Sequence, residues 1–140
     1  MFIARASRHD RDELKELIES QGWDPTHLAE GTTLIARDGP IAGCVRLVEI
    51  EPRTVMVDDV LVREDKRGQG LGQRLMQAAM NNRGGTLYLC CHDDVLGFYD
   101  KFGFTQMPYD ELPQSVRDYF ERVGDYPTDQ EHEHFFLKAR

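Results

Sequence analysis

Three closely spaced glycines lie where a predicted strand gives way to a predicted helix. The segment REDKRGQGLGQRLMQAAM, residues 63–80, has Gly68, Gly70 and Gly72 at every second position, followed by apolar residues with helical spacing. The first amides of a helix have no internal partners, and the helix dipole adds about half a positive charge there. Glycine allows positive φ and lets an anion approach the backbone closely. The spacing therefore predicts a main-chain site for a phosphate or a pyrophosphate.

Two well-known phosphate motifs do not match this segment. A P-loop requires Lys followed by Ser or Thr after its last glycine, whereas Gln73 and Arg74 follow here. A dinucleotide fingerprint reads G-x-G-x-x-G, whereas this segment reads G-x-G-x-G, and no acidic ribose-binding residue ends a following strand. The remaining pattern is Arg/Gln-x-x-Gly-x-Gly/Ala, which residues 67–72 match. For these six residues alone, a glycine-rich turn without a ligand stays open as an alternative.

A second segment, LGFYDKFGF at residues 96–104, follows a buried strand at the distance expected for a short helix. Together the two segments resemble the GNAT superfamily of N-acetyltransferases. The pattern of that family is a strand ending in valine, a loop with acidic and basic residues, R-x-x-G-x-G, and further on F-Y-x-K-x-G-F. The order and spacing of the elements agree from residue 2 to residue 104, about three quarters of the chain.

The resemblance implies an α/β (α+β) fold, with a mixed, mostly antiparallel sheet that is splayed in its middle and flanked by helices. It also implies acetyl-CoA as co-substrate, bound in the gap between two splayed strands. The backbone of Val60, Leu61 and Val62 would pair with pantetheine. The pyrophosphate would lie on the amides of residues 67–72, and further contacts are implied at two aromatic side chains. The implied cofactor-binding residues are Val60, Leu61, Val62, Arg67, Gly68, Gln69, Gly70, Leu71, Gly72, His92 and Phe98.

Tyr99 matches the tyrosine of the family that lies near the CoA sulfur and protonates the departing thiolate. Phenols have a pKa of about 10 and thiols of about 8.5, close enough for such a transfer. The alternative is that Tyr99 is an aromatic core residue beside Phe98 and Phe102. His92 stands seven positions before Tyr99, where the family often has an asparagine that contacts pantetheine. This histidine could contact the cofactor or act as a base. It could also have neither role, and the sequence leaves all three alternatives open.

The acceptor amine must lose a proton before it attacks. At pH 7 this costs about 4.6 kcal/mol for an alkyl amine and about 1.4 kcal/mol for an α-amino group. Asp58 and Asp59 interrupt an otherwise apolar strand just before the residues that would pair with pantetheine. Strand alternation predicts that their side chains point to opposite faces, so that at most one lines the cleft directly. We take Asp58 ahead of Asp59 as the base, with Glu49 in reserve. The alternative is that these acids only meet solvent at a splayed sheet.

The pattern of apolar residues predicts the elements that position these side chains. A meander of strands, followed by helices between later strands, indicates a mixed α/β sheet in one domain, residues 1–140. Asp38-Gly39-Pro40 marks a hairpin and Glu51-Pro52-Arg53 a turn. Strands are predicted at 2–6, 32–37, 41–49, 54–62, 86–91 and 133–138. Helices are predicted from a capping box at Ser7 and Asp10 to Ser20, from the glycines to a stop sequence at 81–85, at 95–102 and at 112–123.

Composition excludes several classes of partner. The net charge is −8 and no long basic tract is present, which argues against nucleic acid. No stretch approaches the roughly 18 apolar residues of a membrane helix. The segment MFIARASRHDRDEL lacks the apolar core of a signal peptide, so we expect a cytoplasmic protein. Cys44, Cys90 and Cys91 are predicted to be reduced thiols packed in a sheet, and no metal-ligand spacing accompanies them, so no metal is expected.

We therefore expect an acetyl-CoA-dependent N-acetyltransferase that acts on the primary amine of a small molecule. GFTQMPYDELPQSVRDYF, residues 103–120, resembles the C-terminal stretch of the acetyltransferase domain of N-acetylglutamate synthases, which makes an amino acid or a similar amine a candidate acceptor. The excess of acid does not favour an acidic substrate. A non-catalytic acyl-CoA sensor is one alternative, and a protein N-terminal or lysine acetyltransferase with acids at Glu111, Asp118 and Glu121 is another. Dimers are common in the family, which allows a homodimer.

Overall fold

The computed structural model describes residues 2–81, 84–127 and 133–140. These residues form a mixed α/β structure with short 3-10 turns between several of the elements. The strands are β1 (Phe2–Arg5), β2 (Thr32–Arg37), β3 (Ile41–Glu51), β4 (Thr54–Val62), β5 (Thr86–Cys91), β6 (Thr105–Met107) and β7 (Phe135–Ala139), and the helices are α1 (Arg11–Ser20), α2 (Leu71–Asn81), α3 (Leu96–Asp100) and α4 (Gln114–Val123).

The strands follow the order β1-β2-β3-β4-β5-β7-β6 in one sheet. Neighbours are antiparallel in β1–β2, β2–β3, β5–β7 and β6–β7, and parallel in β4–β5. The parallel register pairs Thr54–Met56 with Thr86–Tyr88 and ends there, whereas β4 continues to Val62. The predicted α/β class with a mixed, mostly antiparallel sheet is therefore confirmed. In the part of the chain that the structure describes, no helix has the length and apolar character that a membrane span requires.

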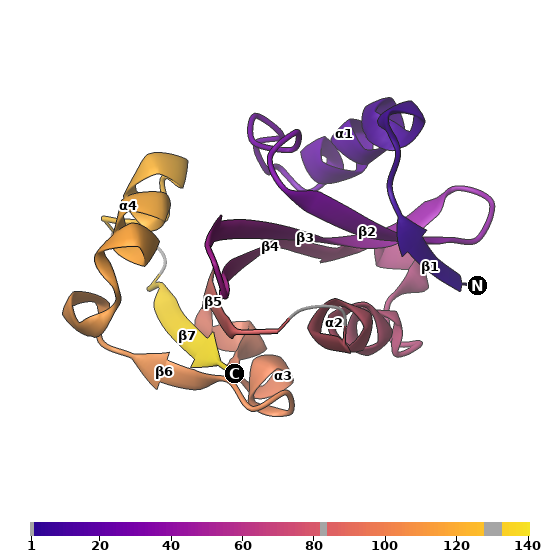
Figure 1. The fold of residues 1–140 in the computed structure, drawn as a ribbon. Coiled ribbons are helices and arrows are strands. Elements are labelled where there is room, and N and C mark those ends of the chain that lie inside the picture. The colour runs from indigo at the N-terminus through magenta and orange to yellow at the C-terminus, as the bar shows by residue number, and fades with distance from the viewer. Residues whose placement is uncertain (1, 82–83, 128–132) are drawn as a thin grey trace. The chain divides into compact units, whose positions relative to one another are not determined.

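The chain divides into two compact units. The first is Met1–Val48 with Val57–Arg83, and the second is Glu49–Met56 with Gly84–Arg140. In the first unit, α1 covers one face of β2 and β3 and α2 covers the other (Figure 1). Alternation along the strands makes this possible, because Cys44 packs into the cluster under α1 while its neighbour Gly43 meets Leu75 of α2.

The helix α1 begins as the sequence predicts. The Ser7 side chain accepts a hydrogen bond from the His9 amide at 3.2 Å, and the Asp10 carboxylate accepts one from the Ser7 amide at 2.8 Å. This reciprocal pair satisfies amides that the turn leaves open. The capping box closes a short 3-10 turn, Arg8–Asp10, from which α1 continues. Leu14, Leu17 and Ile18, whose spacing in the sequence is that of one helix face, form the buried stripe of α1.

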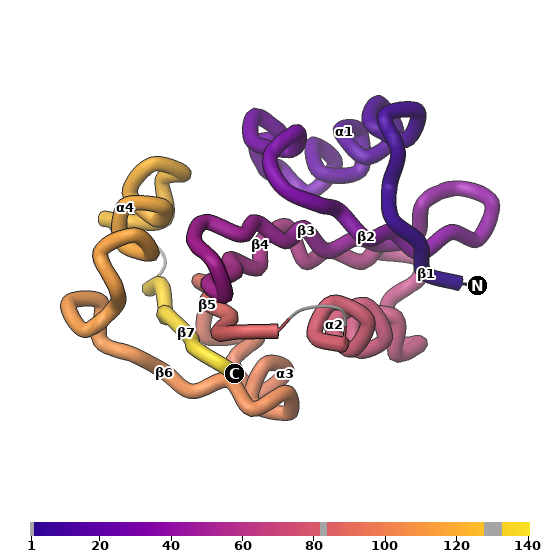
Figure 2. Tube along the Cα trace, viewed as in Figure 1, coloured from indigo at the N-terminus to yellow at the C-terminus, as the bar shows by residue number. Residues whose placement is uncertain are grey.

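The second unit is built around β7, which lies between β5 and β6. Figure 2 shows the chain running from β5 through α3 to β6, and then through α4 back to β7. Phe120 of α4 packs on Phe136 of β7, with ring centroids 4.9 Å apart. Both side chains are almost fully buried, so this aromatic contact anchors α4 to the sheet.

The predicted elements agree with the structure to within a few residues. The helix at 95–102 is a 3-10 turn followed by the short α3, and β3 extends two residues beyond 49. The three-residue β6 was not predicted, because its residues are mostly exposed and only its pairing with β7 makes it a strand. Of the stop sequence at 81–85, Asn82 and Arg83 lie outside the described residues.

We predict that Gly31→Ala destabilises the first unit far more than Gly39→Ala. Both glycines have positive φ, +81° and +73°, so both substitutions carry left-handed strain of about 1–2 kcal/mol. A Cβ on Gly31 would overlap the Leu47 carbonyl oxygen, whereas one on Gly39 would meet nothing within 4 Å. The clash should therefore cost Gly31→Ala about 1–3 kcal/mol more. Urea denaturation of the two variants measures the difference, and equal losses would contradict the close approach of Gly31 to β3.

Candidate active site

The loop between β4 and α2 forms a main-chain cradle at residues 67–72. Gly68 and Gly70 have φ of +81° and +78°, which glycine adopts without strain. A Cβ at either position would meet nothing within 4 Å, and the four residues from Arg67 to Gly70 are exposed. The glycines are therefore required by backbone conformation, and the space beside them is open. These features fit a diphosphate that approaches the chain from solvent.

Hydrogen bonding within α2 starts at the cradle. The Arg74 amide donates to the Gly70 carbonyl at 3.1 Å. The amides of Leu71, Gly72 and Gln73 precede it, and amides in this first turn have no acceptor within the helix. They are therefore available as donors, and the helix dipole would favour an anion beside them.

Side chains of the loop hold it by bonds to neighbouring segments. Arg67 donates through Nε to the Val62 carbonyl at 3.0 Å and through Nη2 to Gln21 Oε1 at 2.7 Å. Lys66 pairs with Asp38 at 2.9 Å, beside the β2–β3 turn. These side-chain bonds thus hold the backbone of the loop in one conformation, which the short Gly-rich sequence would not adopt by itself.

A buried arginine organises the two aspartates of β4. Arg46, 2% exposed, donates through Nε to Asp59 Oδ2 at 2.8 Å and through Nη2 to Asp58 Oδ2 at 3.2 Å. Its Nη1 donates to the Glu30 carbonyl at 3.0 Å. Sequence reasoning did not identify Arg46, because one charged residue in an apolar strand carries no motif. A charge in the middle of the buried run Ile41–Val48 was nevertheless a sign that carboxylates lie nearby.

The prediction that Asp58 and Asp59 point to opposite faces is wrong. Both carboxylates contact the same guanidinium. The reason is the backbone of Asp59, whose φ of +50° breaks the alternation of the strand. The Asp59 amide also donates to Asp58 Oδ1 at 2.9 Å, which links the two residues directly. Alternation holds only for regular extended backbone, and no residue pattern around position 59 indicates a left-handed conformation.

The environment of Asp59 favours its protonated form. Burial and the neighbouring Asp58 charge raise the pKa of Asp59, while the hydrogen bond and the charge of Arg46 oppose this. Next to it, Cys44 Sγ donates to the Asp59 carbonyl at 3.3 Å, and burial raises the pKa of this thiol to about 12. Cys44 is therefore a packed thiol, and Cys44, Cys90 and Cys91 take part in no disulfide bond among the described residues.

The remaining predicted site residues belong to the second unit. Tyr99 is 7% exposed, and its ring meets Phe98 and Phe104 edge-on at 5.0 Å and 5.8 Å. His92 is exposed and stacks on His134, with ring centroids 5.0 Å apart. The packing of Tyr99 is that of an aromatic core residue.

The family is established by its sequence model. The model described as "Acetyltransferase (GNAT) domain" matches residues 29–106, more than half of the chain. The chain therefore belongs to the GNAT family of acetyltransferases. No curated protein sequence matches it significantly.

Solved structures share the fold at low identity. N-acetylglutamate synthase from Neisseria gonorrhoeae, complexed with coenzyme A and L-arginine, has a TM-score of 0.73 and 21% identity. That match covers 99% of this chain, which spans only 32% of the synthase. Ribosomal-protein-S18-alanine N-acetyltransferase from Escherichia coli has a TM-score of 0.75 and 14% identity over 99% of this chain and 92% of that one. An aminoglycoside 6′-N-acetyltransferase complexed with coenzyme A has a TM-score of 0.70 and 16% identity, with coverages of 99% and 96%.

The raised pKa of Asp59 predicts the sign of a pH effect on stability. The folded protein keeps the Asp59 proton to higher pH than the unfolded chain, in which the pKa is near 3.8. The free energy of unfolding of the wild type should therefore fall, relative to Asp59→Asn, as the pH rises from that value through the raised pKa. Asparagine tolerates the left-handed backbone and does not titrate in this range. Urea denaturation between pH 3 and 8 measures the difference.

Asp65→Asn provides a control of opposite sign. Its hydrogen bond from Arg63 lowers the pKa of Asp65, so the wild type should lose stability relative to this variant as the pH falls. A difference for Asp59→Asn that is flat, or that has the sign of the Asp65 control, would contradict the raised pKa.

Proposed function

We propose that this protein transfers the acetyl group of acetyl-CoA to the primary amine of a small molecule. The observation that carries the proposal is the cradle at residues 67–72, with its two left-handed glycines and the first amides of α2. Membership of the GNAT family supports the same cofactor. An amino acid or a similar amine is our candidate acceptor, and a cytoplasmic enzyme that is either a monomer or a homodimer belongs to the same proposal.

The amides of residues 67–72 would hold the diphosphate of acetyl-CoA. The backbone of Val60, Leu61 and Val62 would pair with pantetheine as an added strand. The course of β4 supports this assignment, because its register with β5 ends at Met56 and the strand continues to Val62. His92 and Phe98 are proposed as further cofactor contacts.

Tyr99 is proposed as the general acid. When the amine nitrogen attacks the acetyl carbonyl carbon, the carbon–sulfur bond breaks and the sulfur leaves with the electron pair. The phenol of Tyr99 would then give its proton to this thiolate. The result is an amide and free CoA thiol, and the proton released by the amine goes to a base.

Asp58 is the better candidate for that base. Its side chain is 28% exposed, compared with 13% for Asp59, so water or an amine can reach it more readily. Arg46 fixes its orientation through Oδ2. Asp59 has the more buried carboxylate, and we assign it first to positioning Arg46 and Asp58. A bound water between Asp58 and the amine would serve the same purpose.

Gly70→Val should weaken acetyl-CoA binding by roughly 100-fold, about 2.7 kcal/mol. Valine disfavours the left-handed φ of +78°, so the amides would turn away from the diphosphate. Gly39→Val is the matched control, because Gly39 also has positive φ and open space but lies in the β2–β3 turn. Calorimetric titration with acetyl-CoA measures both. Tight binding by Gly70→Val, or equal weakening by Gly39→Val, would reject the cradle.

Tyr99→Phe should lower turnover by roughly 100-fold or more while acetyl-CoA affinity stays within a few-fold. Only the phenol proton is lost, whereas the ring contacts remain. Tyr119→Phe removes a hydroxyl from a similarly buried tyrosine on α4 and should leave turnover unchanged. The assay follows release of CoA thiol with a panel of amines. Equal losses of affinity and turnover would refute the proton-donor role, and binding with no turnover on any amine would assign a sensor instead.

A further inference from the structure

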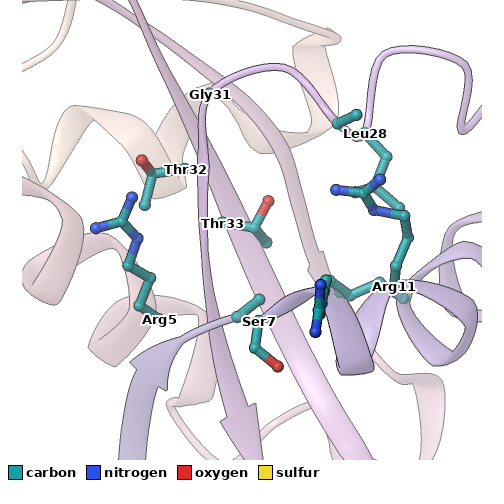
Figure 3. A pocket seen from close by; sticks show the side chains of 11 residues that line it. Arg5, Ser7, Arg11, Leu28, Gly31, Thr32 and Thr33 are labelled. Carbon is teal, nitrogen blue, oxygen red and sulfur yellow. The ribbon is translucent and has the colours of Figure 1, made fainter.

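A small pocket lies between the start of α1 and the loop that precedes β2, within the first unit. Its volume is about 120 Å³, and three arginines, Arg5, Arg8 and Arg11, line it together with Ser7, Thr32 and Thr33. Figure 3 shows Thr33 near the middle of the pocket, with Arg5 on one side and Arg11 on the other. No acidic side chain is among the described residues that line it.

The three arginines have no charge partner in the part of the chain that the structure describes. The ion pairs and side-chain hydrogen bonds there involve other side chains, and Arg5, Arg8 and Arg11 take part in none. All three residues are exposed, so water hydrates their guanidinium groups when no ligand is bound. Guanidinium groups gathered without a carboxylate repel one another, and an anion between them would relieve that repulsion.

Nearby acids are directed elsewhere. Asp10 and Glu13 both pair with Arg37 of β2, and Glu13 also accepts from the Ile41 amide. The arginines recur every third residue, at 5, 8 and 11, across the end of β1, the 3-10 turn and the first residue of α1. This segment thus separates its charges, with the acids toward Arg37 and the bases toward the pocket.

A hydroxyl of a buried residue in the same pocket lacks a protein partner. Thr33 is 8% exposed, and its side chain makes no hydrogen bond with any other described residue. Among the described residues, the buried side-chain atoms without a partner are Ser115 Oγ and Arg117 Nε, so the Thr33 hydroxyl is reached by solvent from the pocket and is available as a donor. An anion in the pocket would accept from this hydroxyl and from the guanidinium group of Arg11, which lies on the same side of β2 in Figure 3, while Arg5 lies beside Thr32 on the other side.

We propose that this pocket binds a small anion bearing a carboxylate or a phosphate group. A volume of 120 Å³ corresponds to roughly four water molecules, enough for such a group with a few carbon atoms and too small for a nucleotide. Planar guanidinium groups match the oxygens of both anions in paired hydrogen bonds. The site is separate from the cradle at residues 67–72, so it stands whether or not the protein transfers acetyl groups.

The loop that lines the pocket also holds Arg46. Leu28, Ala29 and Gly31 line the pocket, and the intervening Glu30 carbonyl accepts from Arg46 Nη1 at 3.0 Å. Arg46 in turn holds Asp58 and Asp59. A ligand that orders this loop would therefore change the NMR chemical shift of the Asp59 amide. Unspecific binding to exposed arginines would leave that chemical shift unchanged.

The test is a ¹⁵N NMR titration with succinate, inorganic phosphate and neutral succinamide at constant ionic strength, with saturating CoA present to occupy the cradle. We expect saturable shifts of the Ser7, Gly31, Thr33 and Asp59 amides with at least one anion and none with succinamide. Arg8→Gln/Arg11→Gln should weaken binding at least about tenfold, and Lys15→Gln, at an exposed position of α1, should not change it. The same titration without CoA, on the wild type and on Gly70→Val, separates a failure of the cradle from a failure of the pocket.

The outcomes decide the proposal and the source of the anion. Tighter binding of succinate than phosphate assigns a carboxylate ligand, and the reverse order assigns a phosphate. Thr33→Val should weaken the preferred anion while the other amide signals keep their folded positions. The proposed site would be overturned by chemical shift changes that do not saturate. It would also be overturned if succinamide reproduced the changes or if the double arginine variant retained them.

Discussion

The buried guanidinium of Arg46 is the interaction on which the centre of the first unit depends. An arginine that is 2% exposed must recover the hydration it loses, and three acceptors replace it. Asp58 and Asp59 come from β4, and the Glu30 carbonyl comes from the loop before β2. The Arg46 side chain of β3 thus bonds to β4 on one side and to the loop before β2 on the other. Removal of either carboxylate would leave a buried charge with fewer partners, so the group acts as a unit.

The cradle follows a different physical principle. Its donors are main-chain amides, and what its sequence must provide is backbone freedom at Gly68 and Gly70. Side chains around it hold the loop but need not touch the ligand. A site built in this way would tolerate wide divergence of the surrounding sequence. Under the proposed function, recognition of an acceptor would depend instead on side chains in loops that the family pattern does not constrain.

Most of the fold could be predicted because its elements have strong local patterns. The β4 strand, the apolar stripe of α1 and the capping box at Ser7 and Asp10 were each visible in the sequence and are present in the structure. The prediction of secondary structure failed where a segment becomes a strand only because it pairs with a neighbouring strand. Residues 105–107 are mostly exposed and short, and they form β6 only because β7 lies beside them. Turns of 3-10 type before α1 and α3 were also missed, since they differ from α-helix by geometry that composition barely affects.

The sequence by itself determined the family pattern and the cradle, because left-handed glycines and the first turn of a helix are properties of consecutive residues. Only the tertiary structure decided how the charges are arranged. Arg46 meets Asp58 and Asp59 across two strands, and the left-handed Asp59 puts both carboxylates on one guanidinium where regular alternation would separate them. Likewise, the three arginines enclose a pocket only when the loop before β2 packs beside them. Contacts between residues distant in the chain depend on packing, and local spacing does not encode them.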